Sequence, residues 1–443
     1  MSLIKKPVTG MRDILPGEME IRQYCMHIIR ETYARYGFTE IETPVVESLE
    51  NLTSKQGGDN EKLIFRILKR GEKLKLEEAK TAEDVSDAGL RYDLTVPLVR
   101  YFANHQNELP LPFKSLQTGN VFRADRPQKG RFRQFQQCDI DILGEAGTIA
   151  EIELILALTE ALGKLDFKSF RIRISDRRLL RAMAAYCGFP EDAQDSVFIT
   201  LDKLDKIGLE GVKKELSENG FAEDAVEKCL SLFANDEPAT DAKTSLLLLD
   251  RFAAAIAGTD KAAGETGTGT ASNDSTAGIA AMTKDAGASL KEIISAVEGA
   301  KDADFEMVFD PTLVRGMGYY TGTIFEVDMP ELGVSCGGGG RYDKMIGRFG
   351  CPETPAVGFS IGFERIILLL LERGFQIPGA AEKTAFLVEK GIDGDALSAI
   401  IKEAAGARKA GTQVLVTRMN KNKKFQKEQL SAQGYTAFRE FFR

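Results

Sequence analysis

Residues 121–137 read VFRADRPQKGRFRQFQQ, and the interpretation of the chain starts from this stretch. Its two ends have strand-like character, and its polar middle carries five cationic side chains: Arg123, Arg126, Lys129, Arg131 and Arg133. Arginine can bind a phosphate through two parallel hydrogen bonds, and the interspersed phenylalanines can stack on a base. Taken alone, the stretch is explained at least as well by an exposed basic hairpin.

Three other stretches combine glycine with polar or aromatic side chains. Residues 313–326 (LVRGMGYYTGTIFE) offer tyrosine hydroxyls in an apolar wall, and residues 336–343 (CGGGGRYD) leave bare backbone against which a flat ligand can lie. Residues 355–365 (PAVGFSIGFER) lead from a strand into a helix, where Arg365 opposes the helix dipole unless an anion binds there. Each has a structural alternative, namely a core hairpin, a glycine bulge or a surface arginine.

Composition narrows the chemistry that these stretches can support. The 443-residue chain holds two histidines, which excludes H-E-x-x-H metal sites and disfavours histidine-based triads. Its six cysteines form no C-x-x-C pair, which is typical of buried thiols in a reducing compartment. The N-terminus lacks the apolar core of a signal peptide, and the longest aliphatic run, residues 366–371, is too short for a membrane span. We expect a cytoplasmic protein with no metal site and no membrane partner.

The net charge of −8 is distributed unevenly. Residues 382–443 contain 12 Lys and Arg against 7 Asp and Glu, so this segment carries +5 and the remainder −13. A basic terminal segment on an acidic body is typical of a protein that contacts nucleic acid over part of its surface. A solvated surface with a chance asymmetry explains the same counts equally well.

The spacing of apolar residues predicts an α+β fold, with an antiparallel sheet flanked by helices rather than a regular βαβ alternation. We assign residues 1–175 and 301–378 to this discontinuous core. Helical patterns dominate residues 176–300, which predicts an inserted helical domain, and the Gly-, Thr- and Ser-rich residues 258–278 predict a flexible loop within it. Residues 382–443 have a βαβαβ-like pattern and predict a small α/β domain.

In their order and spacing, the four stretches resemble the signature motifs of the histidyl-tRNA synthetase family. Residues 121–137 are similar to motif 2 of class II aminoacyl-tRNA synthetases, and residues 355–365 to motif 3. The two stretches between them resemble the histidine-specific motifs of the family. Residues 36–47, with Pro44, are similar to motif 1, residues 10–16 to the family's N-terminus, and residues 90–97 to its amino-group-binding segment. The resemblance is close over residues 5–175 and 305–375.

This resemblance implies an ATP-dependent ligation of L-histidine to tRNA(His) through a histidyl-adenylate, with Mg²⁺ accompanying ATP. It implies a class II sheet core, a homodimer formed through motif 1, and a C-terminal domain similar to an anticodon-binding domain. It also implies roles for individual side chains. The catalytic residues are Arg123 and Arg315; the ATP-binding residues are Arg123, Arg131, Phe135 and Arg365; the histidine-binding residues are Asp93, Thr95, Gln137, Asp141, Arg315, Tyr319 and Tyr320.

The chain departs from the family pattern at several positions. Asp141 stands where the family usually has Glu, which shortens the reach to the imidazole, and Gly318 replaces an Asp before the tyrosine pair. Gln136 replaces a common His, and Asp139 a common Gly. The C-terminal domain is also shorter than the family's anticodon-binding domain.

Two other functions fit parts of the same pattern. A non-catalytic paralogue of the family acts as the regulatory subunit of ATP phosphoribosyltransferase, but it typically lacks an intact motif 2 loop, the motif 3 arginine and the terminal domain. A free-standing enzyme that forms histidyl-adenylate without a role for tRNA is the other alternative. The arginines at positions 123, 131, 315 and 365 favour the synthetase over the regulatory subunit.

Overall fold

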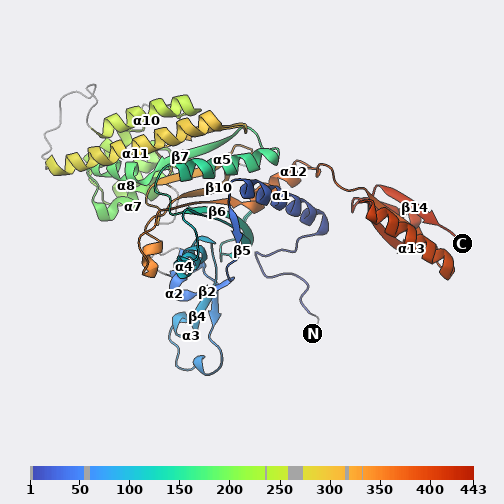
Figure 1. Cartoon of the computed structure of the whole chain (residues 1–443). Coiled ribbons are helices and arrows are strands. Elements are labelled where there is room, and N and C mark those ends of the chain that lie inside the picture. The colour runs from blue at the N-terminus through green and yellow to red at the C-terminus, as the bar shows by residue number, and fades with distance from the viewer. Residues whose placement is uncertain (1–2, 54–59, 235–236, 258–272, 315–318, 332) are drawn as a thin grey trace. The chain divides into compact units, whose positions relative to one another are not determined.

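The computed structural model describes residues 3–53, 60–234, 237–257, 273–314, 319–331 and 333–443 (Figure 1). The chain divides into two compact units. The first comprises Met1–Met11 and Ile28–Leu368, and the second comprises Arg12–His27 and Leu369–Arg443. Within the described residues, none of the helices combines the length and the apolar character that crossing a membrane requires.

In the described part of the first unit, one large sheet has eight strands in the order β1-β5-β6-β11-β10-β9-β7-β8. The inner neighbours pair antiparallel, whereas the outer pairs β1–β5 and β7–β8 are parallel. The predicted antiparallel core is therefore confirmed, with parallel pairing added at both edges. The strands are β1 (Thr39–Ile41), β5 (Phe113–Phe122), β6 (Gln134–Leu143), β7 (Phe170–Asp176), β8 (Phe305–Phe309), β9 (Thr323–Met329), β10 (Val334–Arg341) and β11 (Ala356–Gly362).

The large sheet has helices on both faces, as Figure 1 shows. Helix α5 (Ile149–Lys164) lies on one face, against β6 and β11, and helix α4 (Thr95–His105) lies on the other. Most apolar side chains of α5 are buried, because the helix packs against the sheet on one side and against α11 (Asn273–Ala300) on another. The apolar spacing of residues 148–165 predicts a helix, and α5 confirms it.

A smaller sheet with the order β2-β4-β3 adjoins α4 in the first unit. The alternating residues 38–47 predict one strand interrupted by Pro44, but they form two strands, β1 and β2, in different sheets. Proline lacks the N–H that a continuous ladder would need at that point. The elements here are β2 (Val46–Ser48), β3 (Arg66–Leu68), β4 (Ser86–Leu90), α2 (Leu49–Thr53), α3 (Ala82–Val85), and the 3₁₀ turns η1 (Asn60–Leu63), η2 (Gly71–Lys73) and, after β10, η4 (Ile346–Phe349).

Helices follow one another between the paired strands β7 and β8. They are α6 (Arg177–Cys187), α7 (Gln194–Leu201) after the 3₁₀ turn η3 (Glu191–Ala193), α8 (Leu204–Glu218), α9 (Glu223–Ser231), α10 (Ala242–Ile256) and α11. Residues 258–272 of the predicted loop lie outside the described residues, and the structure begins α11 at Asn273, so the end of that range is helical. The division into compact units groups these helices with the sheet, and the inserted domain stays a prediction.

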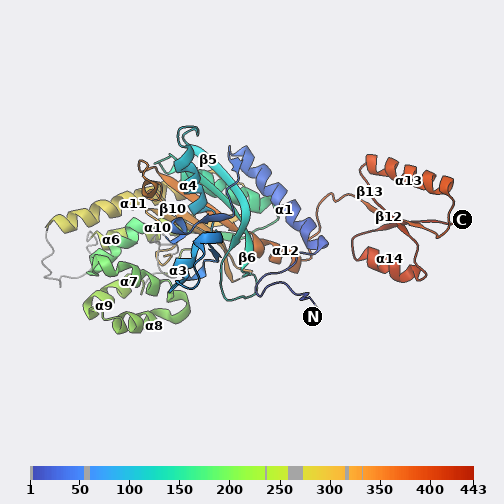
Figure 2. The same cartoon turned by 90° about the horizontal axis from the view of Figure 1, so that it is seen from below.

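The second unit contains a three-stranded parallel sheet in the order β13-β12-β14. Its central strand, β12 (Lys383–Val388), is buried on both faces, with Phe386 packed toward α13 (Gly394–Lys409) and Leu387 toward α14 (Lys423–Ser431). Figure 2 shows the two helices on opposite sides of the sheet. With β13 (Gln413–Arg418) and β14 (Ala437–Phe441), this confirms the predicted βαβαβ pattern. Helices α1 (Pro16–Arg35) and α12 (Phe363–Glu372) run from one unit into the other along the chain.

Candidate active site

A cavity of ≈ 370 Å³ lies over the middle strands of the large sheet. It brings together nearly all the residues that were predicted for the site, although they come from distant parts of the chain. Those that line it are Asp93, Thr95, Arg123, Arg131, Phe135, Gln137, Asp141, Tyr319, Tyr320 and Arg365. Arg315 and Gly318 lie outside the described residues.

Strand β6 supplies a row of polar side chains to this cavity. Gln137, Asp139 and Asp141 are spaced two apart, so they point to the same face of the sheet. On the neighbouring strand β11, Gly358 pairs with Asp141. A Cβ atom at position 358 would lie 1.8 Å from Oδ1 of Asp141, so glycine is required there for the carboxylate to reach the cavity.

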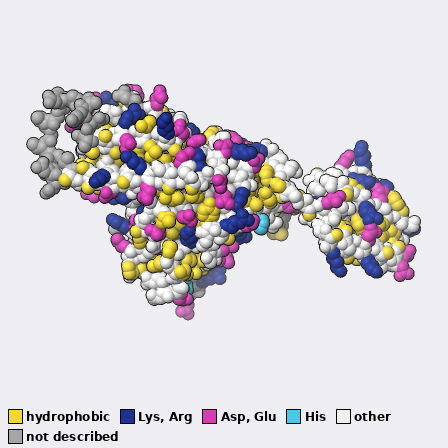
Figure 3. All heavy atoms as spheres, turned by 45° about the horizontal axis from the view of Figure 1, so that its top comes forward, with side chains coloured by type: hydrophobic (Ala, Val, Ile, Leu, Met, Phe, Trp, Pro, Cys, Tyr) yellow, Lys and Arg dark blue, Asp and Glu magenta, His cyan; other side chains and the backbone are white. Residues whose placement is uncertain are grey.

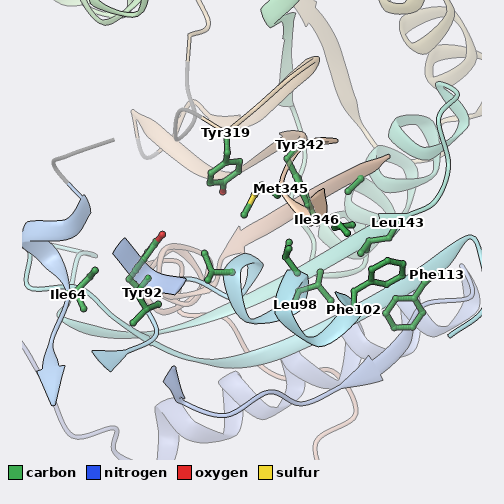
Figure 4. Packing of buried hydrophobic residues seen from close by; sticks show 14 of the residues in the cluster. Ile64, Tyr92, Leu98, Phe102, Phe113, Leu143, Tyr319, Tyr342, Met345 and Ile346 are labelled. Carbon is green, nitrogen blue, oxygen red and sulfur yellow. The ribbon is translucent and has the colours of Figure 1, made fainter. Parts of the chain in front are cut away.

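Three tyrosines form the apolar wall beside Asp141. The ring centroid of Tyr319 lies 4.8 Å from that of Tyr320 and 6.1 Å from that of Tyr342. Figure 4 shows Tyr319, Met345 and Tyr342 next to one another in the packed cluster. The hydroxyl of Tyr342 donates to Oδ1 of Asp141 at 2.6 Å. This carboxylate is therefore held in one orientation within an aromatic pocket.

Two further side chains, Asp93 and Gln137, present acceptor oxygens to the cavity. Asp93, just before α4, accepts the backbone N–H of Val96 with Oδ1 at 3.1 Å. Its Oδ2 and the Oε1 of Gln137 are buried and have no hydrogen-bond partner among the residues that the structure describes. Buried acceptors are normally satisfied, so these two oxygens are suited to a donor that a ligand brings.

Burial controls the protonation of these carboxyls. It raises the pKa of Asp93 to about 6 and that of Asp141 to about 7, which the Tyr342 hydrogen bond partly opposes. Burial also raises the pKa of Asp139 well above its usual range, and the Asp141 charge adds to this effect. Each group would ionise more readily if a cation entered the cavity.

The opposite side of the cavity is basic and its arginines have protein partners. Arg123 donates from Nε to the carbonyl of Tyr92 at 2.8 Å, and its guanidinium carbon lies 5.2 Å from the ring centroid of Phe135. Arg131 forms two 2.9 Å hydrogen bonds with the carboxylate of Asp125. Arg365, at the start of α12, donates to the carbonyl of Ser335. Cations, an aromatic ring and exposed backbone on this side could hold a nucleotide.

A family model described as histidyl-tRNA synthetase matches residues 10–267 and 263–366 of the chain. The chain belongs to the histidyl-tRNA synthetase family. The synthetase is 43% identical over 441 residues to the histidine–tRNA ligase of Leifsonia xyli subsp. xyli, covering 98% of this chain and 94% of the relative. It is 37% identical over 390 residues to that of Christiangramia forsetii, covering 85% of this chain and 79% of the relative.

Solved structures with a similar fold include a histidyl-tRNA synthetase from Nostoc sp. PCC 7120, with a TM-score of 0.74 and 26% identity over 98% of this chain and 90% of that one. A Bacillus halodurans protein described as an ATP phosphoribosyltransferase regulatory subunit/histidyl-tRNA synthetase has the same TM-score at 20% identity, over 100% and 99%. The latter likeness concerns the fold alone. The relatives identify the synthetase as a class II aminoacyl-tRNA ligase that charges histidine tRNA, and they do not favour the regulatory-subunit alternative.

Sequence reasoning missed several residues of the synthetase cavity. Tyr342 was quoted within residues 336–343 but not assigned to the site, and Asp139 was noted only as a departure from the family pattern. The period-two spacing on β6 could have identified Asp139. Asp125 and Ser360 also line the cavity. No local sequence pattern predicts this, because Asp125 reaches the cavity through the loop between β5 and β6 and Ser360 through the pairing of β11 with β6.

One buried ion pair supports the strands beneath the cavity. Arg341, at the end of β10, makes two 2.7 Å hydrogen bonds with Glu151 of α5. Its NH1 and NH2 groups donate to the carbonyls of Glu145 and Gly147. The pair links the end of β10, just before Tyr342, to α5, and losing one partner would leave a buried charge.

Proposed function

We propose that the synthetase forms histidyl-adenylate in this cavity and then transfers histidine to the 3′-terminal ribose of tRNA(His). In the first step, the histidine carboxylate attacks the α-phosphate of ATP and pyrophosphate leaves. In the second, the ribose hydroxyl attacks the acyl carbon, loses its proton, and AMP leaves. The observation that carries the proposal is a pair of buried acceptors, Asp93 Oδ2 and Gln137 Oε1, in the same cavity as Asp141. Neither has a hydrogen-bond partner among the described residues.

The acidic side of the cavity would bind histidine at two points. The ammonium group donates to Asp93 and Gln137, with Thr95 at the start of α4 beside them. The imidazole N–H donates to Asp141, whose other contact, the hydroxyl of Tyr342, holds the carboxylate in place. Tyr319 and Tyr320 enclose the ring and offer a hydroxyl to its second nitrogen. An amino acid without a ring donor would bury the Asp141 carboxylate with only the Tyr342 hydrogen bond, which penalises its binding strongly.

The basic side would bind ATP. Phe135 is suited to stacking on adenine, and Arg123, oriented by Tyr92, is suited to the α-phosphate and the substrate carboxylate. Arg131 and Arg365 would exchange their present partners for the outer phosphates. We retain Arg315 in the catalytic role that the family resemblance implies. Mg²⁺ would arrive with ATP and neutralise part of the phosphate charge, and no residue is assigned to it.

The first step needs no strong general base, because a carboxylate is already a nucleophile. Catalysis then consists of holding the carboxylate and phosphate in line and stabilising the charge that develops at phosphorus. Arginines can do both, which accounts for a cavity without histidine in its described lining. This chemistry fits the side chains present better than a triad-type hydrolase would.

The proposal extends to assembly and tRNA binding. Residues 36–47 would form a homodimer interface as motif 1 does in the class, and the protein would act in the cytoplasm. The second unit, with its basic surplus, would contact the anticodon arm of tRNA(His). Figure 3 shows basic and acidic side chains interspersed on the visible face of this unit, so contact there would be distributed over several side chains rather than one patch.

Histidine-dependent exchange of pyrophosphate into ATP tests the first step, and charging of tRNA(His) tests the second. We expect the wild type to perform both, and Arg315→Ala to lose exchange while still binding histidine in a calorimeter. Exchange without charging would instead indicate an enzyme that only forms the adenylate. Histidine binding without exchange would overturn the proposed mechanism and revive the regulatory-subunit alternative.

A further inference from the structure

The side-chain amide of Gln137 has a defined orientation next to a second carboxylate. Its Nε2 donates to Oγ of Ser360 at 2.6 Å and lies 3.4 Å from both carboxylate oxygens of Asp139. Its Oε1 is buried without a partner in the described part of the chain. The amide thus turns its donor toward Asp139 and its acceptor away from it.

Of the two neighbours, Asp139 is the one that can select this orientation. A serine hydroxyl can donate or accept, so Ser360 would tolerate either end of the amide. Burial favours the protonated form of Asp139 in the empty cavity, whereas a bound ammonium ion favours the ionised form, whose oxygens only accept. If the amide of Gln137 were reversed, its Oε1 would face both oxygens of Asp139, and two acceptors would be opposed in a buried site. The Ser360 hydroxyl accepts from Gln137 and donates its own hydrogen bond to Asp139.

The sheet register keeps these three residues together. Gln137 and Asp139 project to the same face of β6, and Ser360 is the direct cross-strand partner of Asp139 on β11. Asp139 is buried. The charged or titratable groups that act on it are Asp93, Asp141, Arg91, Arg123, Tyr33, Tyr320 and Cys138. A bound ammonium ion favours the ionised carboxylate, so ligand binding and the required charge state support each other.

We propose that Asp139 is a positioning residue that fixes the amide of Gln137, so that its carbonyl oxygen and Asp93 together receive the substrate's ammonium group. The inference rests on the proposed binding of histidine in this cavity. Asp139 then makes the site selective for ligands that carry an ammonium group, without itself contacting the imidazole.

Two ligands separate this role from general support of the fold. Histidinol keeps the ammonium and imidazole groups of histidine and lacks the carboxylate, whereas imidazole-4-propionate lacks the ammonium group. In titration calorimetry with full-length protein, Asp139→Asn is expected to weaken histidinol roughly tenfold and imidazole-4-propionate by less than about twofold. As a control, Asp176→Asn changes another buried carboxylate, one that caps α6 outside the cavity, and should leave both affinities unchanged.

A double-mutant cycle separates positioning from a direct effect of the Asp139 charge. In a Gln137→Met background the amide is gone, so Asp139→Asn should have little further effect on histidinol. An equal loss of affinity for both ligands in Asp139→Asn would overturn the proposal. So would a double variant whose loss of histidinol binding free energy equals the sum of the two single losses. If the wild type bound neither histidine nor histidinol, the proposed function itself would fail, and this outcome is distinct from either of the others.

Discussion

The two sides of the cavity are built in different ways. The acidic side lies on β6 and α4, where Asp93 and Gln137 are buried and keep acceptor atoms without described partners. The basic side lies largely on the loop between β5 and β6, where half-exposed Arg131 is already paired with Asp125. In the proposed function, the acidic side would thus offer free acceptors before histidine binds, whereas the basic side would have to exchange protein contacts for phosphate contacts. We therefore expect selectivity for histidine to reside on the acidic side.

The largest expected effect comes from the basic side. Arg123→Ala removes the cation suited to the α-phosphate, and we expect kcat for pyrophosphate exchange to fall roughly 10³-fold. Binding of histidinol, which lacks the carboxylate that Arg123 is also suited to hold, should remain within a fewfold of wild type in calorimetry. A comparable loss of histidinol affinity would mean that the two sides are not separable. Arg126→Ala, from the same loop, serves as the matched control.

On the acidic side, Asp141→Asn preserves shape and can still accept from Tyr342 but loses its charge. We expect kcat/KM for histidine to fall about 10²-fold, because a charge-assisted hydrogen bond to the ring is lost. The KM for ATP should stay nearly constant when exchange is measured at saturating histidine. An equal rise in both KM values would contradict the division of the cavity.

The Asp141→Asn variant should also have a higher free energy of unfolding than the wild type at pH 8. Burial raises the pKa of Asp141 to about 7, so the folded state holds its proton above the pH at which the unfolded chain releases it. The contribution of Asp141 to the free energy of unfolding of the wild type therefore declines as pH rises from about 4 to 7, by at most roughly 4 kcal/mol. We expect Asp141→Asn to gain about 2 kcal/mol, a factor of roughly 30 in the unfolding equilibrium. Denaturant titration at pH 8 measures this gain, and the gain should vanish near pH 4, where the folded and unfolded states both begin to hold the proton.

Histidine binding should weaken as the pH falls. The carboxyls of Asp141 and Asp93, with pKa values raised to about 7 and about 6, lose their acceptor charge below those values. We expect KM for histidine to rise about tenfold from pH 7.5 to pH 6, while KM for ATP changes less. The share of this rise in KM that comes from Asp141 should be absent in Asp141→Asn. The variant therefore distinguishes titration of Asp141 from titration of the substrate's own imidazole. An unchanged profile in the variant would refute the assignment.

The smallest expected effect concerns the pair on the nucleotide side. Asp125→Asn weakens the partner that competes with phosphate for Arg131, so KM for ATP should fall about two- to fivefold, in keeping with the modest strength of an exposed ion pair. Exchange kinetics at varied ATP would measure the change. A higher KM would mean that Asp125 orients the arginine for ATP instead of competing with it.

Much of the local structure was predictable from periodicity and turn residues. The spacing of apolar residues reflects burial directly. It predicts helices over residues 17–37 and 148–165, close to the observed α1 and α5, and the βαβαβ pattern of the second unit. Parallel pairing at the two sheet edges had no local signal. The pairing of β7 with β8 joins strands separated by a long helical segment, and such long-range pairing depends on packing of the whole unit.

The sequence by itself determined the family and the kinds of side chain available, since the motif residues and the spacing of Gln137, Asp139 and Asp141 can be read directly from it. Only the tertiary structure decided how those side chains meet. Tyr342 reaches Asp141 across 201 positions of sequence, and the register of β6 against β11 places Ser360 beside Asp139. The physical reason is that periodicity encodes which face of an element is buried, whereas strand register and long-range packing determine which atoms share that buried space.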